Sequence, residues 1–377
     1  MTPVTLMDNQ TLFRDISIFE SGYTPDTIRY RDNQLQQLAE AVRPALLGGC
    51  PLNTVIRGPP GTGKTTCVRQ IFAELEEMPR IIPVLVSCQT ALTVFRVFQR
   101  IYQTVFRQQP PISGVSVASL TEAVCRELSR RNAALLICLD DANLLFHDHV
   151  LDQVLRSLLR LHEEYPGIRI GVIVIISDPR LSLYPFLSLS VVSVFRPNEV
   201  YFPPYGREEV HAILRDRVRA GLYPDVISPG VLDCIAAETV KGTNLRAGIR
   251  LLKDAVMQAE NDGRTTVTRS DVAAAVQQIT DLHLVSIVRT LKEDERLMLA
   301  RIAALHQTRG GDMISGELFR ALHKQMPMCY TLFFERLNTF RNRGLIDIYR
   351  PPNRGNTRKI LLRYDAGQMR AVCETPE

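Results

Sequence analysis

The stretch with the clearest chemical potential reads GPPGTGKT and runs from Gly58 to Thr65. It matches the pattern G-x-x-x-x-G-K-[ST], whose glycines let backbone N–H groups turn towards phosphate oxygens. The lysine of such a loop, here Lys64, reaches the outer phosphates, and the hydroxyl of Thr65 is placed to bind Mg²⁺. A chance glycine-rich turn is the alternative, but the stretch follows a strand-like run and opens a helical pattern, which is the context that a phosphate-binding loop requires. We therefore predict ATP or ADP and Mg²⁺ as ligands. The predicted nucleotide contacts in this loop are Gly58, Pro59, Pro60, Gly61, Thr62, Gly63, Lys64, Thr65 and Thr66.

A pair of carboxylates follows a second apolar run, in LLICLDDANLLF (135–146). In a protein with a phosphate-binding loop, the acidic end of a later buried strand holds the magnesium ion, directly or through water. We therefore predict that Asp140 binds the metal together with Thr65. Asp141 falls where a general base activates the attacking water, and the alternative is that it only caps the following helix. Lys64, Asp140 and Asp141 are the catalytic candidates.

Short apolar runs and helical patterns alternate along the first part of the chain. The runs are NTVIR (53–57), IPVLVS (82–87), LLICLD (135–140) and IRIGVIVIIS (168–177), with PNEVYFPPY (197–205) as a last strand. This alternation predicts a parallel sheet that is covered by helices on both faces.

Helical patterns without intervening strands follow from residue 206 to about 283. Beyond them, three helical patterns precede two strands, LIDIYR and RKILLRY, which are joined by PPNRGNT. Three helices followed by a hairpin indicate a winged helix. We predict an α/β P-loop core (1–198), an all-α lid (199–283) and a C-terminal winged-helix domain (284–377).

The composition is that of a folded protein with several domains. The 377 residues are 45% hydrophobic and 23% charged, and this length favours two or three domains. No run approaches the roughly 18–20 apolar residues that span a membrane, and the first residues lack a signal-peptide pattern. We expect a cytoplasmic protein without a membrane partner. The eight cysteines contain no C-x-x-C pair, which favours reduced thiols over structural zinc or a disulfide framework.

The net charge of +5 is unevenly distributed. Residues 289–370 hold 16 Lys and Arg against 8 Asp and Glu. A local excess of positive charge favours a polyanionic partner such as nucleic acid, and the alternative is a set of solvated helix faces.

The P-loop GPPGTGKTT, the acidic strand end and the all-helical lid resemble those of AAA+ ATPases. Three further stretches are similar to archaeal and eukaryotic replication initiators, the family of the large origin-recognition-complex subunit and the cell-division-cycle loader protein. These stretches are YTPDTIRYRDNQLQQLAEAV (23–42), VYFPPYGREEVHAILRDRV (200–218) and GTNLRAGIRLLKDA (242–255). With the terminal winged helix, the resemblance covers nearly the whole chain. The short N-terminus resembles archaeal members of the family.

The resemblance implies an ATP-dependent initiator that binds double-stranded DNA at a replication origin and helps to load the replicative helicase. Related initiator subunits and a nucleoid-associated location are further implications. In the family, the first stretch folds over the adenine with an arginine at the position of Arg31, and the third carries the sensor-2 arginine, here Arg246. Arg246 thereby joins the catalytic candidates. The nucleotide contacts that the resemblance adds are Tyr23, Arg31, Tyr205 and Arg246.

The chain departs from the family pattern around the site of hydrolysis. The usual Asp-Glu pair is Asp140-Asp141, and a base set back by about 1.5 Å can cost on the order of 10²-fold in rate. The asparagine usual at sensor 1 is replaced by Ser177 or Asp178 in IISDPRL. The arginine that reaches a neighbouring subunit's nucleotide has no clean match, and Arg196 is the nearest candidate. We therefore expect a slow ATPase, which converts ATP and water to ADP and phosphate.

Basic residues of the winged helix are the predicted DNA contacts. In its third helix, Phe333, Phe334, Leu337 and Phe340 have the spacing of a buried face, so the arginines are better placed to meet DNA. The hairpin can lay guanidinium groups on phosphates or in a minor groove, and a solvated hairpin is the alternative. By resemblance, the helix within 90–111 also touches DNA, although helix packing explains most of its pattern. The predicted contacts are Arg336, Arg341, Arg343, Arg350, Arg354, Arg358, Lys359 and Arg100.

Two other functions stay open at this point. In the first, the protein is a DNA-binding regulator, a diverged paralogue in which nucleotide is a structural ligand and hydrolysis is insignificant. In the second, it is a signalling ATPase whose winged helix binds protein.

Overall fold

The computed structural model describes residues 11–20, 22–111, 114–178, 181–242, 244–309, 313–349 and 358–374. The chain forms two compact units, residues 1–269 and 270–377. The predicted boundary between residues 283 and 284 falls within helix α11 (Arg269–Arg289). The division into three domains stays a prediction.

The first unit is built on a parallel sheet of five strands in the order β2-β3-β4-β1-β5. All of its strand pairs are parallel, which places each connecting helix on one face of the sheet. The five strands coincide with the predicted runs, and β5 ends before the prolines at 203 and 204. Their bounds are β1 (Thr54–Arg57), β2 (Ile81–Ser87), β3 (Ala134–Asp140), β4 (Ile170–Ile176) and β5 (Asn198–Tyr201).

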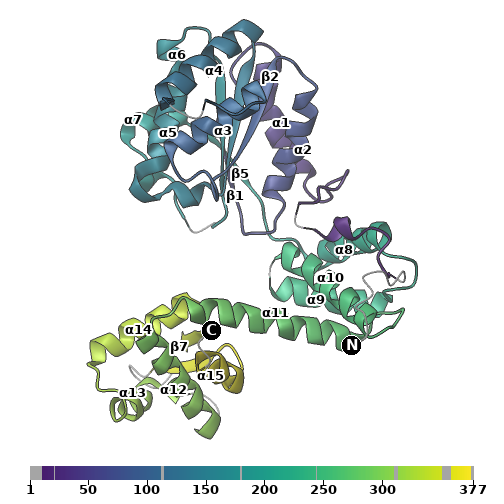
Figure 1. Ribbon diagram of the computed structural model, residues 1–377, viewed down its shortest axis with the longest axis vertical. Helices are drawn as coiled ribbons and strands as arrows, with labels where there is room; N and C mark the ends of the chain where they lie inside the picture. The colour runs from purple at the N-terminus through teal and green to yellow at the C-terminus, as the bar shows by residue number, and fades with distance from the viewer. Residues whose placement is uncertain are drawn as a thin grey trace. The chain divides into compact units, whose positions relative to one another are not determined.

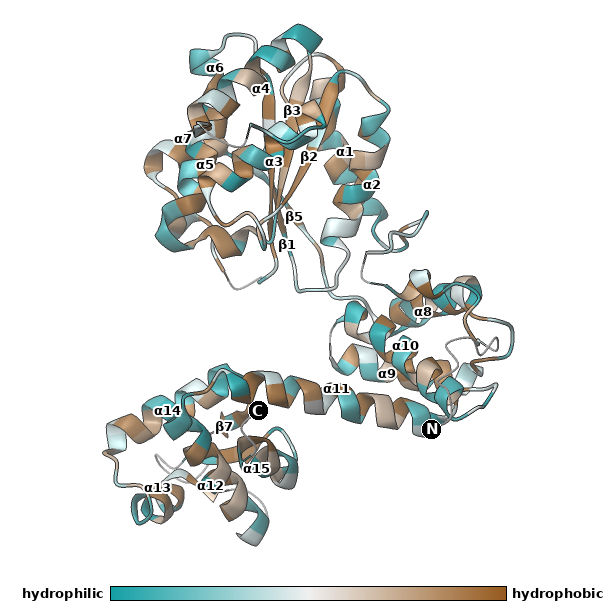
Figure 2. Cartoon of the chain, in the orientation of Figure 1, coloured by the Kyte–Doolittle hydropathy of each residue, from teal (hydrophilic) through white to brown (hydrophobic). Residues whose placement is uncertain are grey.

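Successive side chains of the central strands enter two different hydrophobic cores, as the two-residue period of a strand requires. On β3, Leu135 and Ile137 belong to one core and Leu136 and Cys138 to the other. Helices therefore cover both faces, and Figure 2 shows the hydrophobic strands lying between them. One layer contains α1 (Asp32–Leu46) and α2 (Lys64–Glu76), and the other contains α3 (Val94–Phe106), α4 (Val117–Arg131), α5 (Val150–Leu159), α6 (Leu161–Glu164) and α7 (Leu189–Phe195) (Figure 1). Short 3₁₀ turns are η1 (Ile16–Phe19), η2 (Ala142–Leu145), η3 (His147–His149) and η4 (Tyr184–Phe186).

Three helices after β5 form the predicted helical lid. They are α8 (Arg207–Gly221), α9 (Pro229–Lys241) and α10 (Leu245–Asn261). The segment 11–20 lies on this lid, a contact that the sequence did not indicate: Phe13 forms an antiparallel bridge with Leu222, and the Leu12 N–H donates to the Glu260 carboxylate at 2.5 Å. Gly221 lets the Phe19 ring approach, because a Cβ at this position would overlap the ring.

The second unit has the predicted winged-helix elements. A core of hydrophobic side chains joins the helices to the sheet, and Phe333, Leu337 and Phe340 lie fully buried in it, as their spacing predicted, whereas Phe334 is only partly buried. Strand β6 and helix α15 were not predicted; α15 packs against α12, with Met369 in the core. The sheet order is β6-β8-β7. The bounds are α12 (Glu293–Arg309), β6 (Met313–Ile314), α13 (Ser315–His323), α14 (Tyr330–Asn342), β7 (Ile346–Tyr349), β8 (Lys359–Leu362) and α15 (Ala366–Glu374). No helix among the described residues is long and apolar enough to cross a membrane.

Candidate functional site

The P-loop connects β1 to the N-terminus of α2, the arrangement that the sequence predicted. Gly61 and Gly63 have φ angles of +75° and +89°, which side chains disfavour, and Gly63 is the N-cap residue of α2. The loop therefore turns its backbone at the positive end of the helix dipole, where an anion is favoured. These glycines fit a phosphate group.

Lys64 is the buried cation of this loop, with only 5% of its surface exposed. Its Nζ donates hydrogen bonds to the carbonyl oxygens of Gly58 at 2.8 Å and Pro59 at 2.7 Å. Burial lowers the pKa of Lys64 to about 8, an effect that the Asp141 charge opposes and the Arg246 charge reinforces. The ammonium group is thus held inside the loop. Burial destabilises its positive charge, and the negative charge of a bound phosphate would stabilise it.

Thr65 and Asp140 meet next to this lysine. The Thr65 hydroxyl donates to Oδ1 of Asp140 at 2.9 Å. Burial raises the pKa of the Asp140 carboxyl, while the bond from Thr65 and the charges of Arg69 and Arg246 oppose the rise. A hydroxyl and a carboxylate oxygen are the hard donors that Mg²⁺ prefers, so the pair fits that ion.

Asp141 lies one residue beyond the end of β3 in a left-handed backbone conformation, with φ of +57°. Both of its carboxylate oxygens accept hydrogen bonds. The Ser177 hydroxyl donates to Oδ1 at 2.5 Å, and the Gln89 amide donates to Oδ2 at 2.8 Å. The side chain therefore faces the ends of the neighbouring strands, and it makes no side-chain cap of η2. The sequence did not predict the hydrogen bond from Gln89 to Asp141, because a glutamine after β2 matches no phosphate-site motif.

The lid approaches the P-loop at the start of α10. A Cβ on Gly61 would overlap the side chain of Asn244, so these two residues are in direct contact. Asn244 is the N-cap residue of α10 and accepts a hydrogen bond from the Arg246 N–H at 3.1 Å. Because the charge of exposed Arg246 affects the pKa of both Lys64 and Asp140, this lid arginine lies within electrostatic range of the phosphate site.

Arg31 is buried and donates a hydrogen bond to the backbone of the P-loop. Its guanidinium donates to the carbonyl oxygens of Thr62 at 2.9 Å, Pro203 at 2.7 Å and Tyr30 at 2.8 Å. It also stacks 3.7 Å from the centroid of the Tyr205 ring. Nucleotide contact by Arg31 stays a prediction, and the structure adds a bracing contact that the sequence did not indicate.

The two predicted tyrosines lie in different surroundings. The Tyr205 hydroxyl lies beside Gly63 of the P-loop, and burial raises the pKa of Tyr205 to about 12. Tyr23 packs instead under the guanidinium of Arg217 on the lid helix α8, with 4.3 Å between the Arg217 Cζ and the ring centroid. Tyr205 is therefore next to the P-loop, while the Tyr23 ring contacts the lid.

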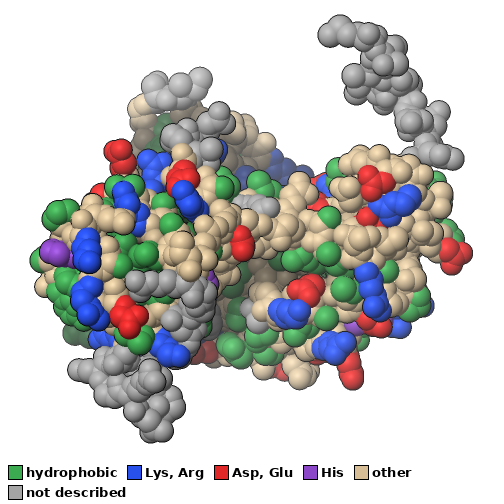
Figure 3. Space-filling view, turned by 90° about the horizontal axis from the view of Figure 1, so that it is seen from below, with side chains coloured by type: hydrophobic (Ala, Val, Ile, Leu, Met, Phe, Trp, Pro, Cys, Tyr) green, Lys and Arg blue, Asp and Glu red, His purple; other side chains and the backbone are tan. Residues whose placement is uncertain are grey.

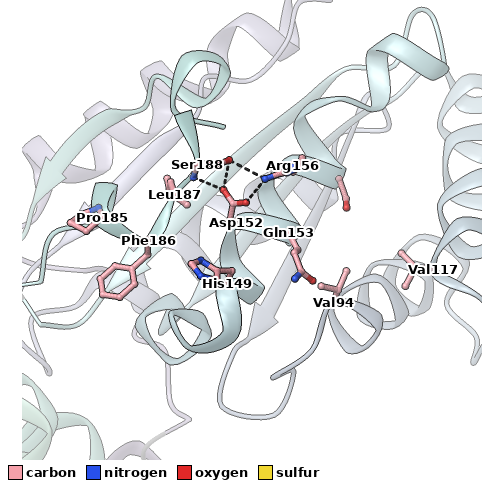
Figure 4. A pocket seen from close by; sticks show the side chains of 11 residues that line it. Val94, Val117, His149, Asp152, Gln153, Arg156, Pro185, Phe186, Leu187 and Ser188 are labelled. Carbon is pink, nitrogen blue, oxygen red and sulfur yellow. Dashed lines mark hydrogen bonds and ion pairs between the residues drawn. The ribbon is translucent and has the colours of Figure 1, made fainter. Parts of the chain in front are cut away.

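A cavity of about 690 Å³ lies elsewhere in the first unit. In one wall Asp152 accepts hydrogen bonds from Arg156 and from the N–H and hydroxyl of Ser188 (Figure 4). Burial raises the pKa of Asp152, but these bonds outweigh that effect and leave it lowered. The network fastens α5 to the start of α7. The lining residues include none of the P-loop, β3 or the lid, so the geometry of the P-loop, and not this cavity, defines the candidate site.

The predicted DNA-binding arginines of α14 differ in their contacts. Arg336 forms an ion pair with Asp294, and its side chain is only 14% exposed. Arg343 donates to the Thr290 hydroxyl at 2.6 Å, whereas Arg341 is exposed. Of these three arginines, Arg341 is therefore the one best placed for an outside partner.

The hairpin and the first unit hold the remaining predicted DNA contacts. Arg358 lies over the Phe334 ring, 4.7 Å from its centroid, and Lys359 begins β8. Arg100 is exposed on α3, with its Nε 3.4 Å from the Leu85 carbonyl oxygen. Figure 3 shows, on the face that it draws, lysine and arginine side chains interspersed with acidic and hydrophobic ones. Arg350 and Arg354 lie outside the described residues.

Two known protein families match successive parts of the chain. Residues 27–175 match the AAA ATPase domain, and residues 211–277 match the Cdc6 AAA+ ATPase-type lid domain. The first match contains the P-loop and both aspartates, and the second contains Arg246.

Similar proteins cover nearly the whole chain. It is 37% identical over 359 residues to ORC1-type DNA replication protein 6 of Halobacterium salinarum, with 95% of each chain covered. The structure of the Aeropyrum pernix ORC1 protein in complex with DNA matches with a TM-score of 0.71 and 24% identity, over 96% of both chains. That of the Aeropyrum pernix ORC2 protein, in ADPNP and ADP complexes, matches with a TM-score of 0.68 and 23% identity, over 96% of this chain and 98% of the other. At these identities the two structures support the fold, and the predicted AAA+ core, lid and winged helix are confirmed. The chain belongs to the family of ORC1-type DNA replication proteins.

Proposed function

We propose that this protein is a nucleotide-dependent initiator of DNA replication. It binds ATP between the P-loop and the lid, binds duplex origin DNA through the winged helix, and helps to load the replicative helicase, together with related initiator subunits. The names of its relatives and the DNA-bound and nucleotide-bound states of its structural neighbours support this proposal.

One observation carries the nucleotide part of the proposal. Lys64, the Thr65–Asp140 pair and the start of lid helix α10 converge on the same P-loop. Lys64 holds the outer phosphates, and Thr65 and Asp140 hold Mg²⁺, which neutralises phosphate charge when it is bound. Arg246, on the lid, contacts the γ-phosphate. Loss of this phosphate on hydrolysis therefore changes the position of the lid.

Calorimetric titration with ATP and ADP tests this assignment. We expect Lys64→Ala to abolish measurable binding, because the buried cation that faces the phosphates is lost. The matched control is Lys241→Ala, which removes an equal charge from an exposed lid lysine that is paired with Glu238. Nucleotide binding that survives in Lys64→Ala, or that is lost equally in both variants, contradicts the site.

Genome-wide mapping of binding sites tests the initiator role. Peaks at one or a few replication origins support it, and peaks scattered over promoters contradict it. The helicase part is tested separately, by asking whether the purified protein recruits the replicative helicase to origin DNA in the presence of ATP.

A second candidate is a DNA-binding regulator that binds nucleotide without significant turnover. The observation in its favour is that both oxygens of Asp141 are engaged by protein donors, which can leave the carboxylate less available as a base. Equal, background-level rates for the wild type and Asp141→Asn in a multiple-turnover assay would favour it.

A further inference from the structure

The side chain of Asp141 accepts hydrogen bonds from residues that follow the two strands on either side of β3. Ser177 follows β4 and donates its hydroxyl to one oxygen, and Gln89, shortly after β2, donates to the other. Ser177 is itself fixed, because its N–H donates to the side chain of Asn143 at 3.3 Å. The direction of the Asp141 carboxylate is therefore set by its neighbours.

The Ser177 hydroxyl has one proton to donate. In the structure this proton is donated to Oδ1 of Asp141. A phosphate oxygen has no proton to give back, so it would need the same hydroxyl proton as Asp141. The Ser177 proton can therefore serve either a γ-phosphate oxygen or Asp141, and the bond that the structure contains is the one to Asp141.

The backbone at residue 141 explains why an aspartate suits this position. Its φ of +57° lies in the left-handed region, where aspartate and asparagine occur several-fold more often than other side chains. A glutamate would add a methylene group that moves the carboxylate away from the hydroxyl of Ser177. The side-chain lengths of Asp141 and Ser177 therefore allow the hydrogen bond between them.

We propose that Ser177 is a positioning residue that acts through Asp141 and does not contact phosphate. This rests on the proposed function, because it requires ATP turnover. In that reaction a water oxygen forms a bond to the γ-phosphorus and its proton passes to Asp141. The bond from the γ-phosphorus to the bridging oxygen breaks, and ADP leaves with that electron pair. Ser177 keeps the acceptor oxygen of Asp141 directed at the water.

The test measures single-turnover hydrolysis together with the affinities for ATP and ADP. The variants are Ser177→Ala, Ser177→Thr, Asp141→Asn and the double variant Ser177→Ala/Asp141→Asn. We expect Ser177→Ala to lower the rate roughly 10- to 100-fold, the range for a misplaced catalytic group. The ratio of ATP to ADP affinity should stay unchanged. Ser177→Thr keeps the hydroxyl and should restore most of the rate, and Ser177→Ala should add no further loss when Asp141 is already Asn.

Each other outcome overturns the inference in a recognisable way. A fall in ATP affinity relative to ADP in Ser177→Ala means that Ser177 contacts the γ-phosphate. A further loss of rate in the double variant means that Ser177 does not act through Asp141. A wild type that binds ATP but hydrolyses it no faster than Asp141→Asn sinks this inference and leaves nucleotide binding intact. A wild type that binds no nucleotide contradicts the proposed function itself.

Discussion

The Thr65 hydroxyl and the Asp140 carboxylate are joined by a hydrogen bond of 2.9 Å, between residues that are far apart in the sequence. Thr65 lies in the first turn of helix α2, and Asp140 ends strand β3. Burial raises the pKa of Asp140, which means that the buried site stabilises the carboxylate charge less well than water does, and a cation beside it would offset that cost. The relationship therefore points to a site that is completed by a metal ion.

We expect Asp140→Asn to remove the Mg²⁺ dependence of nucleotide binding. Asparagine keeps the shape of the side chain and loses the charge, so affinity with Mg²⁺ should fall by about 10- to 100-fold, towards the value in chelator. Titration of ADP with and without Mg²⁺ measures this. Asp148→Asn is the control, since Asp148 is exposed and asparagine tolerates its φ of +49°. An unchanged response to Mg²⁺ in Asp140→Asn would remove this residue from the metal site.

The lowered pKa of Lys64 predicts how nucleotide affinity depends on pH. Phosphate favours the charged lysine, so binding raises a pKa that burial has lowered to about 8. Below that pH the lysine is already protonated and its contribution is constant. Above it, binding must take up a proton, so affinity falls as pH rises, by up to about tenfold per pH unit. Titrations of ADP from about pH 7 to 9.5 check this, with proton uptake measured in buffers of different ionisation enthalpy. Affinity that stays flat across this range would show that Lys64 is charged throughout.

Arg31 should contribute strongly to stability although it pairs with no carboxylate in the contacts described. Its guanidinium serves three carbonyl oxygens and stacks on Tyr205. Arg31→Ala leaves these three oxygens without their donor, including that of the buried residue Thr62, and it removes a buried side chain from its contact with Tyr205, so we expect the free energy of unfolding to fall by roughly 2–3 kcal/mol. Arg29→Ala is the matched control: Arg29 is half exposed in an ion pair with Asp216, so its loss should cost about 0–1 kcal/mol. Denaturant unfolding of the two variants compares them directly, and equal losses would contradict the bracing role.

The sequence predicted the parts of the site that follow fixed local patterns. The P-loop spacing placed Lys64 and Thr65 because a glycine turn between a strand and a helix is a local structure. The apolar run before Asp140 likewise predicted a strand end. The bonds from Gln89 and Ser177 to Asp141 could not be predicted, because they depend on strands that are neighbours in the sheet and distant in the chain. For the same reason the packing of residues 11–20 on the lid came only from the structure. Helix α15 is short and follows the predicted hairpin, so no periodic pattern marked it.

Among the arginines of α14, we expect Arg341 to bind DNA and Arg336 to stabilise the fold. Arg336 is paired with Asp294 and largely buried, while Arg341 is exposed. Arg341→Ala should weaken duplex DNA binding, reduce the slope of log affinity against log salt by about 1, and leave stability within about 0.5 kcal/mol. Arg336→Ala should instead lower the free energy of unfolding, and Asp294→Ala should do the same, since each breaks one ion pair. Salt-dependent DNA titrations and thermal melts of the three variants distinguish the two roles. If Arg336→Ala reduced the salt slope without loss of stability while Arg341→Ala had no effect, the face of α14 that meets DNA would be the one that carries Arg336.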